Sequence, residues 1–139
     1  MATLIRPEIS ENKKYWVNKH RQYELKHFCL QYPYWKKKYS ELENPNVSVS
    51  NFEWRSSTTI PGDPTSKVAL SKTYYAKRIE LIEQTAKNTD LYLYPYILKA
   101  VTEGHSYTYL KNVMGIPCGR DMYYDRYRKF FWLLNNARD

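Results

Sequence analysis

Apolar residues recur along much of the chain at steps of three and four, a spacing that places them on one face of an α-helix. We expect such a helix over Glu11 to Glu43. Pro33 should kink or split it, because proline lacks a backbone N–H and disfavours helix at the residue before it. A short helix over residues 34–42 would follow. One face of the first helix is predicted to carry Tyr15, Trp16, Lys19, Tyr23, Lys26 and Leu30.

Residues 44–63 show no helical period and are rich in Ser, Thr and Asn, with Pro45, Pro61 and Gly62 among them, which is typical of a linker. Four apolar residues there are expected to form a short extended piece that docks on the helices. These are Val47, Val49, Phe52 and Trp54.

A helix is expected after the linker, with Asp63 as its N-cap and Pro64 at its first position, where a missing N–H costs nothing. It should run to Lys87. A further helix with Pro95 in its first turn should end at Gly104, because glycine accepts the left-handed backbone that closes many helices. The apolar positions of these two helices are Val68, Tyr75, Ile79, Ile82, Ala86, Tyr94, Ile97, Leu98 and Val101.

The C-terminal segment has the pattern of a helix-turn-helix. Ser106 can cap a short helix, Gly115 allows a tight turn, and Ile116 would fill the angle between two closely crossing helices. The inward positions of the short helix are predicted to be Tyr107, Leu110 and Val113, and those of the final helix Tyr123, Tyr127, Phe130 or Phe131, and Leu134.

Together these elements predict a small all-α protein with an N-terminal helical hairpin or long helix and a C-terminal helix-turn-helix. The predicted organisation is an N-terminal helical segment for oligomerisation or partner contact over residues 1–43, the linker over 44–63, and a DNA-binding domain over 64–139.

Charge and composition narrow the partners. The chain of 139 residues has a formal net charge of +8, and such a balance favours association with a polyanion. Among its residues are 15 Tyr, which we interpret as filler for a thin core and for interfaces rather than as a platform for single-stranded bases. No apolar run approaches the ~20 residues of a membrane span, and the first residues lack the apolar region of a signal peptide. We therefore expect a cytoplasmic protein with no membrane partner.

The final helix carries the residues expected to contact double-stranded DNA. Its N-terminal turns would enter the major groove, where Arg can pair with guanine and Asp can accept from cytosine. The base-reading candidates are Arg120, Asp121, Tyr124, Asp125 and Arg128, and the phosphate-contacting candidates are Tyr107, Lys111, Asn112 and Lys129. Ser106, as the cap of the preceding helix, completes the predicted site.

The charged residues of the final helix and of the lysine run at 36–38 each allow an interpretation without nucleic acid. The final helix is also consistent with an amphipathic surface helix whose acids, Asp121 and Asp125, pair internally with Arg128 or Lys129. The run of three lysines at 36–38 is more typical of a solvated helix face than of a phosphate contact.

The chain offers little for catalysis or cofactor binding. Cys29 and Cys118 lie far apart, and the three histidines supply no short-range set of metal ligands. There is no Gly-rich phosphate loop, and no Ser or Cys is an obvious nucleophilic partner for any of the histidines. We predict a non-enzymatic protein without metal or cofactor.

The layout resembles the phage late-gene transcriptional regulators of the RinA/ArpU type. The similarity covers the Tyr/Lys/Glu-rich N-terminal helix from Tyr23, the linker ending in Asp63-Pro64-Thr65 and the helix containing residues 78–83; the block Ile97 to Leu134 carries most of it. The resemblance implies a helix-turn-helix like that of sigma-factor region 4, binding to DNA near a late phage promoter, and a link to host RNA polymerase.

The leading hypothesis is a sequence-specific DNA-binding regulator, an activator of phage or prophage genes, whose first helix pair supplies a partner or homodimer contact. One alternative is a small terminase-like accessory protein for DNA packaging or recombination, which would form rings. Another is a protein-binding anti-host factor, for which salt-dependent DNA binding would be absent.

Overall fold

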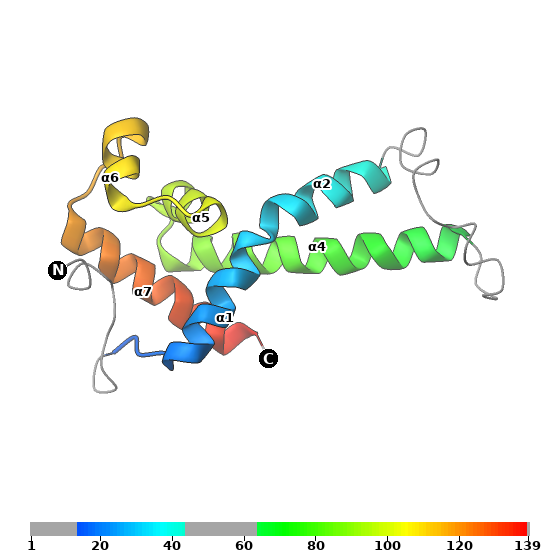
Figure 1. The fold of residues 1–139 in the computed structure, drawn as a ribbon, viewed down its shortest axis with the longest axis horizontal. Helices are drawn as coiled ribbons and strands as arrows, with labels where there is room; N and C mark the ends of the chain where they lie inside the picture. Colours follow the sequence, from blue (N-terminus) through cyan, green and yellow to red (C-terminus); the bar gives the residue numbers. More distant parts are fainter. Residues whose placement is uncertain (1–13, 44–63, 139) are drawn as a thin grey trace. The chain divides into compact units, whose positions relative to one another are not determined.

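The computed structural model describes residues 14–43 and 64–138, and these residues form helices and no strand. The prediction of an all-α protein is therefore confirmed. The helices are α1 (Lys19–Leu30), α2 (Tyr32–Glu43), α4 (Pro64–Thr89), α5 (Tyr94–Glu103), α6 (Tyr107–Tyr109), the π-helical turn η3 (Leu110–Met114) and α7 (Arg120–Ala137) (Figure 1). The predicted linker, with the Asp63 cap and the extended piece from Val47 to Trp54, lies outside the described residues.

The contacts between residues divide the chain into two compact units. One contains residues up to Gln31 and residues from Leu81 onward, and the other spans Tyr32 to Glu80. In the first unit α1 packs against α5 and α7, so the segment predicted as an N-terminal module is shared between the two units. This grouping differs from the expected boundaries at 43 and 64, because α1 provides part of the core under α7.

The first helix is shorter than expected and buries a different face. Residues 14–18 are not helical, and the Asn18 side chain caps α1 by accepting a 3.0 Å hydrogen bond from the His20 N–H. The buried side chains of α1 are Leu25, Phe28 and Cys29. The predicted stripe was wrong. Tyr15 and Trp16 precede the helix, and on α1 itself Tyr23 and Leu30 are exposed, with the Lys26 ammonium 5.8 Å from the Tyr23 ring centre.

The predicted split near Pro33 is confirmed. The chain leaves α1 at Gln31, and α2 begins at Tyr32 with Pro33 as its second residue. A proline is tolerated there because the first helical N–H groups have no partner within the helix.

The middle helices follow their predicted courses. In α4 the expected face is buried at Ile79, Ile82 and Ala86, and the helix continues two residues beyond Lys87. The last residue of α5 is followed by Gly104 in the left-handed conformation, at φ 76°.

The segment between α5 and α7 contains a turn that the sequence pattern did not predict. Ser106 caps α6 as expected, since its hydroxyl accepts from the Tyr109 N–H at 3.2 Å. The helix then widens over η3, where the Gly115 N–H donates back to the Leu110 carbonyl. This i→i+5 ring holds one more residue than an α-helical turn. Leu110 therefore stays buried, whereas Val113, predicted inward, is 64% exposed.

The turn closes through Gly115, which has φ 69°, and Ile116 is buried as predicted. On α7 the buried face consists of Tyr123, Phe130, Phe131 and Leu134, and Tyr127 is half-buried with its ring 5.1 Å from that of Phe131. Burial raises the pKa of the Tyr123 hydroxyl, so this tyrosine is a neutral part of the core.

We predict that Gly115→Ala lowers the free energy of unfolding by about 1–2 kcal/mol, because a Cβ disfavours the left-handed backbone. A Cβ placed at Gly115 would meet no atom within 4 Å, so steric contact adds nothing to this cost. Gly115→Asn is the matched control and should lose less, since Asn adopts this conformation more readily. Urea denaturation followed by circular dichroism measures both; equal losses would contradict the backbone explanation.

Candidate nucleic-acid interface

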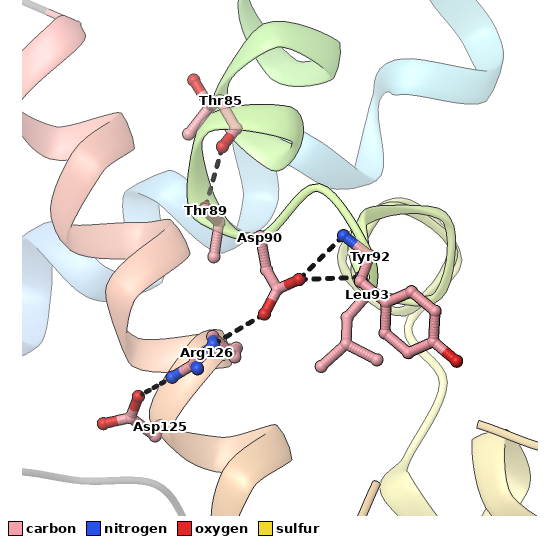
Figure 2. Close-up of polar contacts among 7 residues, drawn as sticks. All are labelled: Thr85, Thr89, Asp90, Tyr92, Leu93, Asp125 and Arg126. Atoms are coloured by element: carbon pink, nitrogen blue, oxygen red, sulfur yellow. Dashed lines mark hydrogen bonds and ion pairs between the residues drawn. The ribbon is translucent and has the colours of Figure 1, made fainter. Parts of the chain in front are cut away.

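A single carboxylate connects the turn between α4 and α5 to the middle of α7. One Asp90 oxygen accepts from the backbone N–H groups of Tyr92 and Leu93, at 2.8 and 3.0 Å, as Figure 2 shows. The other accepts from Arg126 Nε at 2.8 Å. Arg126 also pairs with its neighbour Asp125 on α7. The carboxylate therefore shapes the start of α5 and fixes α7 beside it.

The hydrogen bonds of Asp90 outweigh the effect of its burial. Removal of the carboxyl from water is the largest single influence and raises its pKa, but the bonds from Arg126, Leu93 and Tyr92 together hold the pKa below the ordinary value of 3.8. The bond with Asp90 is also the main cause that raises the pKa of Arg126. The pair is thus charged at neutral pH, with the Asp90 side chain only 15% exposed.

The C-terminal end of α7 is held by α1. Arg21 Nε donates to Asn135 Oδ1 at 2.7 Å, and another Arg21 nitrogen donates to the Arg138 carbonyl at 2.9 Å. The Arg138 guanidinium lies over the Phe28 ring, 4.1 Å from its centre. Because α7 is tied at its middle and at its end, its rotation about its own axis is fixed, and so is the side that it presents to solvent.

None of the predicted base-reading residues is among the buried residues of α7. Arg120 and Asp121 are exposed in the first turn, while Tyr124, Asp125 and Arg128 are half-buried. The Arg120 guanidinium lies 4.9 Å from the Tyr107 ring centre, a cation–π distance. Among the described residues, neither Arg120 nor Arg128 has an acidic partner.

The ion pair found within α7 differs from those expected if α7 were only an amphipathic surface helix. Asp125 pairs with Arg126, and within the described part of the chain Asp121 makes no ion pair with Arg128 or Lys129. Among residues 14–43 and 64–138, no acid forms an ion pair with Arg120, Arg128 or Lys129.

The predicted phosphate-contacting residues do not all lie together on the surface. Lys111 and Asn112 are exposed on η3, and Lys129 is half-buried on α7. Tyr107 is buried instead: its hydroxyl donates to the Cys118 carbonyl at 2.7 Å and its ring lies 5.6 Å from that of Tyr123. Tyr107 thus connects α6 to the turn before α7, and its ring supports the Arg120 guanidinium.

Sequence reasoning missed Asp90 and Arg126, which are 36 positions apart. An Asp just before a helix can accept hydrogen bonds from the N–H groups two and three residues later, as Asp90 does, and this is a recognisable turn signal. Nothing in the local spacing of Arg126 distinguishes it from Arg128, so the pair could not be predicted.

We predict that Asp90→Asn lowers the free energy of unfolding at pH 7 by about 2 kcal/mol, the scale of hydrogen bonds to a charged group. Because folding lowers the pKa of Asp90, its charge stabilises the fold above pH 3.8, and this contribution is lost as the pH falls through the lowered value. The difference between the two proteins should therefore shrink in acid. Asp121→Asn, at an exposed position, is the control and should change stability by less than ~0.5 kcal/mol. Urea titrations at pH 7 and pH 3 measure this, and a gap that stays constant with pH would contradict the assignment.

In residues 14–43 and 64–138, no group of three His, Cys, Asp or Glu side chains is placed to hold a metal ion. None of the helices there combines the length and hydropathy that a bilayer crossing requires. Comparisons of the chain with family models, curated proteins and solved structures found no significant match.

Proposed function

We propose that the protein is a sequence-specific binder of double-stranded DNA and that α6, η3 and α7 form its helix-turn-helix. The observation that carries this proposal is the pair Arg120 and Arg128. They lie eight residues, or about 12 Å, apart along α7. Arg120 is exposed, Arg128 is half-buried, and neither has an acidic partner among the described residues. Two such cations, on a helix whose rotation is fixed, suit the major groove.

The chemistry of base reading follows from these side chains. An Arg can donate two hydrogen bonds to the O6 and N7 atoms of guanine. Asp121 and Tyr124, beside Arg120, would accept from cytosine or donate to a base edge. Asp125 is engaged with Arg126, so its role would be to hold that side chain rather than to read a base.

Phosphate contacts would come from η3 and from the start of α7. Lys111 and Asn112 are exposed just before the turn. The N-cap of α7 is Gly119, which has no side chain to satisfy the first N–H groups of the helix. Free N–H groups at a helix start favour a phosphate, and such contacts set the position of a protein on DNA.

The biological role we propose is regulation of phage or prophage genes, without enzymatic activity and with host RNA polymerase as a further partner. This part of the proposal rests on the resemblance to the RinA/ArpU-type regulators.

We predict that Arg120→Ala combined with Arg128→Ala weakens binding to a selected duplex at least about tenfold, since each bidentate contact contributes ~1–3 kcal/mol. The duplex would be selected from a random pool, and affinity measured by fluorescence anisotropy over a salt series. Lys19→Ala with Lys87→Ala is the matched control: it removes two exposed charges from α1 and α4 and should affect binding much less.

Unchanged affinity in the arginine double variant, with its helicity retained, would overturn the assignment of α7. If the protein shows no salt-dependent binding to DNA, a protein-binding role would be favoured instead. Light scattering on the same samples separates a monomer or dimer from the ring expected of a terminase-like protein.

A further inference from the structure

The unit from Tyr32 to Glu80 carries a surface of tyrosine rings and cations that the proposed helix-turn-helix does not use. Tyr34 on α2 is 55% exposed and Tyr74 on α4 is 48% exposed. The Lys38 ammonium lies 5.7 Å from the Tyr34 ring centre, and the Arg78 guanidinium lies 3.6 Å from that of Tyr74. Each exposed ring thus has a cation beside it.

The two helices bring these groups together around Tyr75. Its ring lies edge-on to that of Tyr74, with centres 5.3 Å apart. Burial, followed by the nearby hydroxyl of Tyr34, raises the pKa of Tyr75, while Lys38 lowers it. Further along the pair, the Lys72 ammonium of α4 lies 5.8 Å from the ring of Tyr39 on α2. The Lys72–Tyr39 contact places α2 beside α4. The ring and cation groups of these two helices, Tyr34 with Lys38 and Tyr74 with Tyr75 and Arg78, are here called the tyrosine platform.

The charge of the unit favours an anionic ligand. Its described helical residues include seven Lys or Arg and three Glu. One of these acids, Glu41, already lies 3.7 Å from Lys38, and Glu43 accepts a hydrogen bond from Tyr39. Lys37 and Lys77 are exposed nearby on the same two helices.

The combination of exposed rings and cations favours single-stranded nucleic acid over a protein partner or a duplex. The core of a protein interface is apolar and depleted of charge, whereas here each exposed ring has a cation against it. Exposed rings with cations alongside are the elements with which proteins hold unpaired bases and the phosphates between them. A duplex keeps its bases stacked on one another, so their faces are closed to such rings.

We propose that the tyrosine platform binds single-stranded nucleic acid, with bases stacked on Tyr34 and on the Tyr74–Arg78 pair and phosphates held by the neighbouring lysines. The proposed site uses no residue of α7 and does not depend on the proposed duplex binding.

The test uses the full chain and a fluorescent oligothymidylate of about 15 nucleotides, with an abasic strand of the same length as the comparison. We expect the abasic strand to bind about tenfold more weakly or worse, because stacking is lost while the phosphates remain. Tyr34→Ala with Tyr74→Ala should reduce thymidylate binding by a similar factor. Tyr34→Phe with Tyr74→Phe keeps the rings and should retain the affinity.

Arg120→Ala with Arg128→Ala is expected to leave thymidylate binding unchanged, which separates this site from the proposed duplex interface. Equal binding of thymidylate, the abasic strand and polyglutamate would show a general polyanion surface and would overturn the proposal. So would an absence of thymidylate binding, or a loss in the Phe variant equal to that in the Ala variant.

Discussion

The arrangement of the unit around α7 depends on the carboxylate of Asp90. Its two oxygens serve two different elements: one closes the turn into α5 through backbone N–H groups, and the other holds Arg126 on α7. The packed apolar side chains of α7 hold the helix against the core. The partly buried charge pair adds a directional restraint, because displacement would leave a buried charge unpaired. This contact, together with Arg21 at the other end of α7, sets the direction in which Arg120 and Arg128 point.

The tyrosines explain how a small unit completes its interior. Tyr107 and Tyr123 place their rings in the core, and the Tyr107 hydroxyl reaches the Cys118 carbonyl at the edge. A ring with a polar tip can fill a thin core and still satisfy a backbone group near the surface. The same residue type is exposed on the other unit, at Tyr34 and Tyr74, where the rings lie beside cations instead of apolar side chains. Composition alone cannot separate these two uses, because the difference lies in what surrounds each ring.

Local features of the fold were predictable from sequence, and longer-range ones were not. The positions of Gly104 and Gly115, the Ser106 cap and the break before Pro33 each follow from the backbone preferences of one residue. The buried face of α1 was missed because its regular spacing of aromatic and lysine side chains belongs to the solvent side, while Leu25, Phe28 and Cys29 form a shorter pattern. The widened turn at η3 has no side-chain signature, so Val113 was placed inward. For the candidate site, the sequence indicated the cations of α7, but the burial of Tyr107 and the Asp90–Arg126 contact depend on tertiary packing.

The extra residue in η3 has a consequence for how this protein can vary in length. An i→i+5 ring encloses one residue more than an ordinary helical turn, so a chain shorter by one residue could close the same helix in α-helical form and keep Leu110 and Ile116 in the interior. A deletion inside α7 cannot be absorbed in this way, because it would rotate every later side chain by about 100° about the helix axis. Single-residue length differences among homologous chains should therefore accumulate between Leu110 and Gly115 and be rare after Arg120.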